Sequence, residues 1–182
     1  CIRDRSRSTL DDYRDRSLAT EIVLGTLRWR ARIDYAVQLA SSRPLQKIDP
    51  DVLDVLRLSV YQLLHLERVP TRAVVNDGVE LTRTLGAKGK KSAAGFVNAV
   101  LHSVANNLDS LQLPQPSLSF PPEARDREAD LQYLSISMSH PRWLVERWYK
   151  RYGFEATQQW TIFNNKPAPI TPVSYTHLTL PT

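Results

Sequence analysis

Residues 92–108 read SAAGFVNAVLHSVANNL, and their apolar positions recur every three or four residues. This spacing predicts one buried face of a helix, formed by Val97, Val100, Leu101, Val104 and Leu108. We therefore expect an amphipathic helix here, packed against other helices through that face.

The two apolar segments before it show the same period. Residues 17–40 predict two helices or one broken helix, with Asp15 or Ser17 available as the N-cap. In residues 48–66, Asp49 is placed to cap a helix that begins at Pro50, where a missing N–H costs no hydrogen bond. The apolar stripe of this second segment is so wide that we expect its helix to be central. The stripe consists of Val52, Val55, Leu56, Ser59, Val60, Leu63 and Leu64.

Residues 71–86 predict a further helix that ends at Gly86. Its expected inward residues are Ala73, Val74, Val79, Leu81 and Leu85. With only 6 glycines, mostly between periodic segments, the 182-residue chain is predicted to have an all-α fold.

The composition excludes several classes of site. Cys1 is the only cysteine, which excludes disulfide frameworks and cysteine-rich zinc sites, and no pair of histidines has the spacing of metal ligands. The net charge of +5 permits a nucleic-acid partner without requiring one. The sequence shows no signal peptide, membrane span or lipidation motif, so we expect a cytoplasmic protein.

Residues 111–122 (LQLPQPSLSFPP) contain four prolines and no charge, which predicts an extended linker. A second helical unit should follow, with breaks at His140-Pro141 and at Gly153. Its expected core residues are Trp143, Leu144, Val145 and Trp148. Its expected outer side is basic, with Arg142, Arg147, Lys150 and Arg151, although nearby glutamates make a mixed-charge surface an equal alternative.

The segment GAKGKKS at residues 86–92 is similar to a phosphate-binding loop, but its glycine spacing does not fit G-x-x-x-x-G-K-[ST]. Two interpretations stay open. Lys88, Lys90 and Lys91 can hold an RNA backbone at a helix N-terminus, or the loop is a solvated connector, the more common role of exposed lysines.

A second basic segment is LRWRARID, residues 27–34. On a helix Arg28 and Arg32 share a face, whereas Trp29 and Arg30 point elsewhere. Trp29 can stack on a base, but a tryptophan beside an apolar stripe more often packs in the core.

Three ordered motifs together resemble the NusB-type RNA-binding domain: DRSLATEIVLGTLRWR, VVNDGVELTR and, most specifically, AAGFVNAVLH. The resemblance covers residues 15–107. Two families carry this domain: stand-alone transcription antitermination factors, and the Sun/Fmu (RsmB) class of ribosomal RNA cytosine-C5 methyltransferases. The later segments SHPRWLVERWYKRYG and NNKPAPIT are similar to the region that joins this domain to the methyltransferase core, and therefore favour the second family.

The resemblance implies five segments. They are a truncated or disordered segment (1–14), a NusB-like RNA-binding domain (15–108), a proline-rich linker (109–122), the helical start of a methyltransferase N-terminal subdomain (123–171) and a tail (172–182). The tail, whose last residues are SYTHLTLPT, does not resemble the family's continuation and is predicted to be non-native.

The implied function is the RNA-binding N-terminal part of an S-adenosylmethionine-dependent 16S rRNA (cytosine-C5)-methyltransferase. The expected partners are small-subunit ribosomal RNA and the missing C-terminal methyltransferase domain, with no membrane. The cofactor would belong to that domain. Because Cys1 matches neither family cysteine, we expect this chain alone to be inactive and to contain no catalytic, cofactor or metal residues.

The RNA-binding candidates follow from charge. We place Arg28, Arg30 and Arg32 first, then Lys88, Lys90 and Lys91, with Arg14, Arg16 and Arg72 as weaker candidates. Asn76 and Asn98 are expected to satisfy buried polar groups instead. Two alternatives remain: an antitermination factor that binds RNA and a ribosomal protein, and a helical scaffold that binds only protein.

Overall fold

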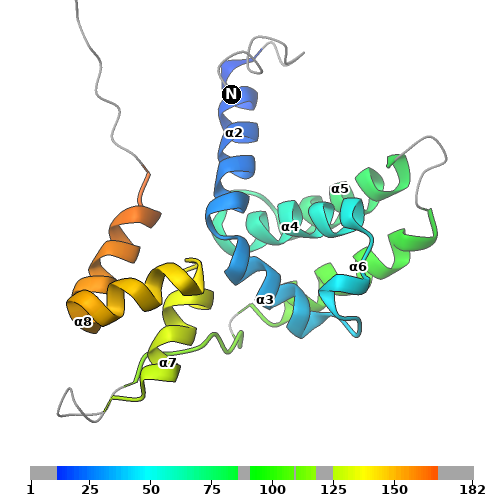
Figure 1. Cartoon of the computed structure of the whole chain (residues 1–182). Helices are drawn as coiled ribbons and strands as arrows, with labels where there is room; N and C mark the ends of the chain where they lie inside the picture. The colour runs from blue at the N-terminus through cyan, green and yellow to red at the C-terminus, as the bar shows by residue number, and fades with distance from the viewer. Residues whose placement is uncertain (1–11, 86–90, 109, 118–124, 168–182) are drawn as a thin grey trace, which may run out of the picture.

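The computed structural model describes residues 12–85, 91–108, 110–117 and 125–167, and the regular elements in these ranges are all helical (Figure 1). The predicted all-α fold is confirmed. Helices α2 to α6 form a bundle, and α7, η3 and α8 form a smaller unit beside it. The tail at 172–182 and the cap expected at Gly86 lie outside the described residues.

α2 (Tyr13–Arg28) and α3 (Arg30–Ala40) are the two parts of the expected broken helix. The break is at Trp29, whose φ of −98° and ψ of 18° depart from helical values. The predicted N-cap was wrong, because α2 begins earlier and Asp12 accepts the backbone N–H of Arg14 at 2.8 Å. The first turn of α2 is exposed and carries no apolar period, so the pattern could not reveal it.

α4 (Pro50–His65) is the central helix and packs against α2, α3, α5 and α6. Asp49 caps it by accepting the Asp51 N–H at 3.0 Å, and Pro50 is its first residue, both as predicted. The short 3-10 turn η1 (Leu45–Lys47) connects it to α3. A helix that is apolar over most of its circumference must be surrounded by neighbours, which explains this position.

α5 (Thr71–Thr84) and α6 (Lys91–Asn106) lie side by side along α4 (Figure 1). The predicted face of α6 is confirmed, because Val97, Val100, Leu101 and Val104 are buried and Leu108 is half-buried. The face of α5 was partly wrong. Leu81 is 44% exposed, and the small or polar Gly78 and Thr82 point inward instead.

Two glycines let the helices of the bundle approach closely. A Cβ atom at Gly25 would lie 2.0 Å from the ring of Tyr61, where α2 crosses α4. A Cβ atom at Gly78 would lie 2.7 Å from the Ser59 hydroxyl. These positions require glycine for space, because native side-chain packing leaves no room for another carbon there.

The smaller unit has its own core of Leu131, Leu134, Val145 and Phe154. Residues 111–117 are not helical, as their prolines predict. α7 (Arg127–Gln132) continues into the π-helical turn η3 (Tyr133–Ser137), and α8 (Arg142–Asn165) follows. The predicted breaks are confirmed, since Pro141 caps α8 and Gly153 bends it with a φ of 77°.

The two units meet at α3, which contacts η3. The backbone N–H of Ala31 donates to the Ser139 hydroxyl at 2.8 Å, and the Tyr35 hydroxyl donates to the carbonyl of Gln112 at 3.4 Å. Within the described ranges, no helix has the length and apolar character needed to cross a bilayer.

Candidate nucleic-acid interface

The structure divides the first predicted basic cluster, residues 28–32, into two environments. Arg30 is exposed at the start of α3, and its Nε lies 3.8 Å from the Asp34 carboxylate. Arg28 and Arg32 are half-buried near aromatic rings. The three arginines therefore do not form one exposed cationic surface.

Trp29 lies in a stack of three rings. The His65 ring lies between Trp29, at 5.0 Å between centroids, and Tyr61, at 5.1 Å. The Arg32 guanidinium lies 5.5 Å from the centroid of the Trp29 ring. The prediction that Trp29 points away from Arg32 was therefore wrong. The helix break at Trp29 turns the ring toward α4. Trp29 is thus a packing residue, and the base-stacking alternative is not favoured.

Burial controls the ionisation of this stack. It lowers the pKa of His65 to about 4, and the nearby Arg32 charge contributes to the decrease. Burial, followed by the hydrogen bond from the Tyr61 hydroxyl to Glu21 at 2.7 Å, raises the pKa of Tyr61 to about 12. Burial also lowers the pKa of Arg32. A partly desolvated guanidinium is less available to a phosphate than an exposed one.

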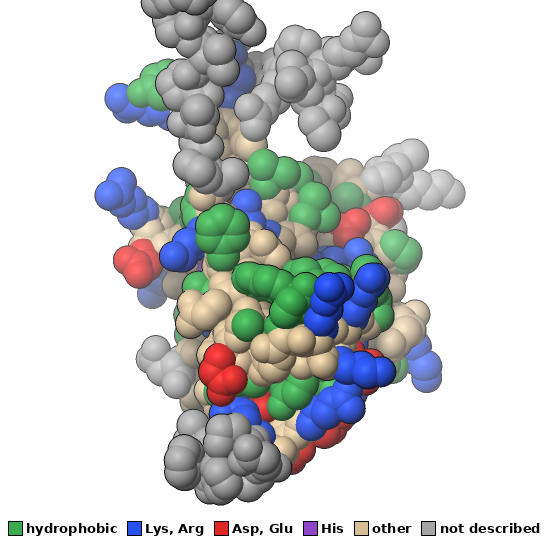
Figure 2. Space-filling view, turned by 60° about the vertical axis from the view of Figure 1, so that its left-hand side comes forward, with side chains coloured by type: hydrophobic (Ala, Val, Ile, Leu, Met, Phe, Trp, Pro, Cys, Tyr) green, Lys and Arg blue, Asp and Glu red, His purple; other side chains and the backbone are tan. Residues whose placement is uncertain are grey.

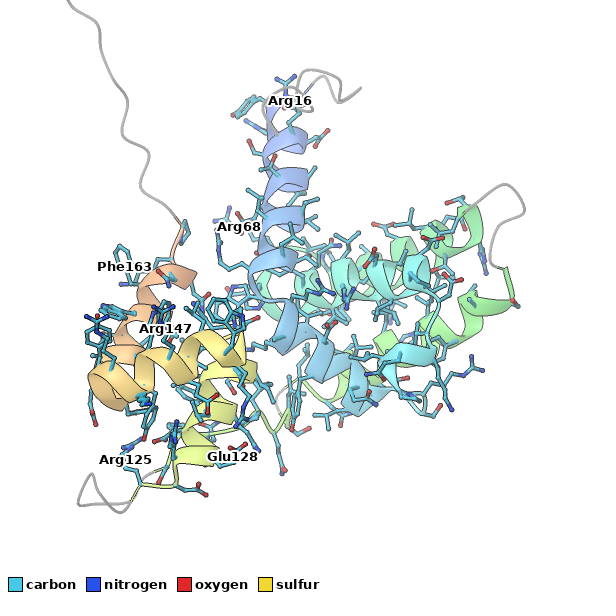
Figure 3. All side chains as sticks on the ribbon, in the orientation of Figure 1. Arg16, Arg68, Arg125, Glu128, Arg147 and Phe163 are labelled. Carbon is cyan, nitrogen blue, oxygen red and sulfur yellow. The ribbon has the colours of Figure 1, made fainter. Side chains whose placement is uncertain are left out.

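The lysine candidates cannot be placed. Lys88 and Lys90 lie outside the described residues, and Lys91 begins α6 with a side chain that is not described. Of the weaker candidates, Arg14 and Arg16 are exposed near the free end of α2, where Figure 3 labels Arg16, and Arg72 is exposed in the first turn of α5.

Asn76 and Asn98 were expected to satisfy buried groups, but both are exposed, so this prediction was wrong. Their apolar sequence neighbours point to the opposite side of each helix, toward the core. Adjacent residues in a helix are about 100° apart around its axis, so an apolar sequence context does not imply a buried side chain.

A further basic surface, which was not among the predicted RNA-binding residues, lies on α8. We call it the α8 outer face and define it by Trp143, Arg147, Lys150 and Arg151. The separations of four, seven and eight residues place these side chains on one side of a helix. All are exposed, and Trp143 has an exposed fraction of 66%.

The core position predicted for Trp143 was therefore wrong. Val145 is fully buried and occupies the core-facing side, while Leu144 and Trp148 are half-buried beside it. The predicted basic outer side is confirmed, because Arg142, Arg147, Lys150 and Arg151 are all exposed. The spacing of Trp143 from Arg147 and Arg151 was the sequence signal that could have placed the tryptophan with the cations.

The charges of the α8 outer face are not neutralised by neighbouring carboxylates. Among the described residues, no ion pair includes Arg147, Lys150 or Arg151. Two nearby acids bind other partners: Glu128 binds Arg142 at 2.6 Å, and Glu146 lies 3.5 Å from Arg127. The exposed Glu155 follows the bend at Gly153 and forms no ion pair with a described residue. The mixed-charge alternative thus applies to the flanks of the helix and not to its outer face.

Aromatic rings brace the bend of α8. Trp160 contacts Trp148 at 5.5 Å and Tyr152 at 4.6 Å between centroids, and Arg151 lies 5.3 Å from the Tyr152 ring. Figure 2, which brings the α8 side forward, shows hydrophobic side chains next to Lys and Arg on this surface. The arrangement combines exposed cations with exposed aromatic rings on a braced helix.

Comparisons with known proteins identify the family of the chain. The sequence model of the NusB family matches residues 3–106. The "Probable ribosomal RNA small subunit methyltransferase B" of Bacillus subtilis (strain 168) is 36% identical over 149 residues, which cover 80% of this chain and 29% of that protein. The protein of the same name from Synechocystis sp. is 30% identical over 157 residues, or 85% of this chain and 31% of that protein.

The "Transcription antitermination protein NusB" of Coxiella burnetii is 34% identical over 88 residues, which cover 48% of this chain and 62% of that protein. No solved structure matches the chain. The chain spans less than a third of the length of the two methyltransferase relatives. Because the family match covers more than half of the sequence, the chain belongs to the NusB family.

Proposed function

We propose that the chain is the RNA-binding N-terminal part of an S-adenosylmethionine-dependent 16S rRNA (cytosine-C5)-methyltransferase. In this function it positions small-subunit ribosomal RNA in the cytoplasm for a catalytic domain outside the chain. The main support is the length of the similarity. Alignments of 149 and 157 residues with the methyltransferase relatives are longer than the match to residues 3–106 and therefore include part of the smaller unit.

The contacts between the units support the same function. The smaller unit packs on α3 through η3 and through the hydrogen bond between Ala31 and Ser139. A unit held against the bundle in this way can fix the direction in which the chain continues toward a catalytic domain. RNA held by both units would then have a defined orientation relative to that domain.

The stand-alone antitermination factor remains the second candidate function. Its support is the similarity to the Coxiella burnetii protein, which covers 48% of this chain. That similarity covers 88 residues and is too short to include both the bundle and the smaller unit in full. The smaller unit favours the methyltransferase function.

Binding of the full chain to a 16S rRNA transcript tests the proposal. We expect the chain to bind the transcript, and we expect an unrelated RNA of the same length to be a poor competitor. The affinity should also fall steeply with salt, with a log–log slope of about −0.7 to −0.9 for each phosphate contacted. Equal binding to both RNAs would contradict a role in placing ribosomal RNA. Weak binding with a slope near zero would favour the protein-binding scaffold.

A further inference from the structure

We propose that the α8 outer face binds an unpaired RNA strand, with a base stacked on Trp143 and phosphates held by Arg147, Lys150 and Arg151. The inference rests on the proposed function and assigns part of the RNA contact to a surface outside the NusB-family match.

The first support is the free indole of Trp143. The other tryptophans, Trp29, Trp148 and Trp160, each contact another aromatic ring. Among the described side chains, no ring or cation–π contact includes Trp143, which is 66% exposed. An indole with both apolar area and a free N–H is suited to contact with a partner.

The second support is the arrangement of charge around that indole. Arg147 and Arg151 follow Trp143 at intervals of one helical turn, and Lys150 lies on its other side. Residues 143–151 extend over about 12 Å of helix axis, which gives room for more than one nucleotide of an extended strand. Exposed cations without carboxylate partners are free to contact phosphates as point charges.

The combination favours an unpaired strand over the other partners. In a duplex the base faces are stacked on each other and are not available to a side chain, whereas a single strand offers them to aromatic rings. Tryptophan and arginine also occur at protein interfaces, so the choice of partner rests on charge. Three exposed cations without an ion-pair partner among the described residues favour a polyanion, and Lys150 is of a residue type that protein interfaces avoid.

The helix that carries the face is anchored through its buried side. Arg142 binds Glu128 through two hydrogen bonds of 2.8 and 2.6 Å, which connect the start of α8 to α7. Val145 is buried in the core of the smaller unit. Substitutions on the outer face should therefore change binding without unfolding the helix.

The first experiment measures binding of the full chain to a fluorescent single-stranded oligoribonucleotide and to the duplex formed with its complement. We expect tighter binding of the single strand. Trp143→Ala should weaken the binding about 5- to 150-fold, the range for loss of one stacked base. Trp143→Phe should restore most of the affinity. Leu39→Ala is the control, since Leu39 is an apolar side chain that is 55% exposed on α3, in the bundle and not on α8.

The second experiment tests the cations. The variant Arg147→Gln/Lys150→Gln/Arg151→Gln should make the log–log salt dependence shallower by about 2, because each phosphate contact with a single strand contributes about 0.7. Arg83→Gln is the control on α5, where Arg83 already lies 3.3 Å from the carboxylate of Glu80. Thermal unfolding of each variant confirms that the fold is retained.

Unchanged single-strand binding by both α8 variants would overturn the inference and assign the face to a protein partner. Equal affinity for the single strand and the duplex would overturn it as well. If 16S rRNA binding survives while these effects are absent, only this inference fails. If the unmodified chain shows no specific RNA binding, the proposed function itself is wrong.

Discussion

The bundle and the smaller unit are stabilised in different ways. The bundle has an extended apolar core, which includes Ile33, Leu56, Val97 and Leu101, and its helices meet through apolar faces. Among its described residues the smaller unit buries four apolar side chains, and the fully buried carboxylate of Asp130 lies beside them. This carboxylate accepts hydrogen bonds from the Ser117 N–H at 2.8 Å, Arg125 at 2.8 and 2.9 Å, and the Tyr149 hydroxyl at 3.1 Å.

The difference shows how a short segment can be ordered without a large core. Asp130 connects the extended segment at Ser117, the start of α7 and the side of α8, while Arg125 also lies 3.9 Å from the Phe154 ring. A buried ion pair stabilises a fold little more than apolar side chains of the same volume would. Removing one partner is nevertheless strongly destabilising, because the other charge is then buried without compensation. The bundle should therefore tolerate the loss of any single polar contact, whereas the smaller unit should not.

Asp130→Ala should have the largest effect. It removes the carboxylate that accepts hydrogen bonds from the Ser117 N–H, the Arg125 guanidinium and the Tyr149 hydroxyl, and it leaves the Arg125 charge unpaired. We therefore expect the free energy of unfolding of the smaller unit to fall by about 3–5 kcal/mol. Hydrogen exchange should become faster in α8 and stay slow in α4. Glu128→Gln is the control, because Glu128 and Arg142 form an exposed ion pair, which contributes little to stability. Uniform destabilisation of both units would contradict their separation.

Gly25→Ala tests packing in the bundle. The new Cβ atom would lie 2.0 Å from the buried Tyr61 ring, so the free energy of unfolding should fall by about 1–3 kcal/mol. Gly95→Ala is the control, since no atom lies within 4 Å of its Cβ position and alanine favours the helix by about 0.5–1 kcal/mol. Chemical denaturation measures both. Equal effects of the two substitutions would show that space at Gly25 is not limiting.

Gly153→Ala tests backbone strain in the smaller unit. Its Cβ position is open, but its φ of 77° favours glycine, so we expect a cost of about 1–2 kcal/mol without a steric clash. Gly153→D-Ala, made by chemical ligation, should recover the stability because a D residue adopts positive φ. A thermal melt that is the same for the L-alanine variant and the unmodified chain would show that the bend does not need this conformation.

The pH dependence should be the smallest of these effects. His65 has a lowered pKa, so the unfolded chain binds more protons than the folded chain between about pH 6.5 and pH 4. The contribution of neutral His65 to the free energy of unfolding is therefore fully present above that window. It is lost as the pH falls through the window, by on the order of 1 kcal/mol after discounting for partial exposure. His65→Phe keeps a ring between Trp29 and Tyr61 and should flatten the curve. Burial lowers the pKa of His140 in the same direction, so some dependence should persist.

The helices of the bundle were predictable because their apolar residues recur at the helical period. Residues such as Val97 and Leu101 are buried as expected. The prediction for the α5 face was less accurate. Gly78 and Thr82 are buried there, and Gly78 lies close to Ser59 and Leu101, a closeness that the hydrophobicity of the sequence does not indicate. The domain boundaries and the RNA contacts of Arg28, Arg30 and Arg32 stay predictions.

The candidate site was less predictable than the fold. The sequence identifies the cations of α8, but it assigned Trp143 to the core because large aromatic residues usually bury their area. The outcome depends on which side of α8 faces Leu131 and Leu134, and these residues belong to another helical segment.

The sequence by itself determined the all-α fold, the breaks at His140-Pro141 and Gly153, and the resemblance to the NusB-type domain, since period, proline and glycine act locally along the chain. It left residues 17–40 as two helices or one broken helix, and the structure placed the break at Trp29. Only the tertiary structure decided that Trp29 stacks on His65 while Trp143 stays exposed among cations. Both tryptophans lie beside arginines in the sequence. What separates them is the presence of a packed helix opposite Trp29 and the absence, within the described residues, of one opposite Trp143.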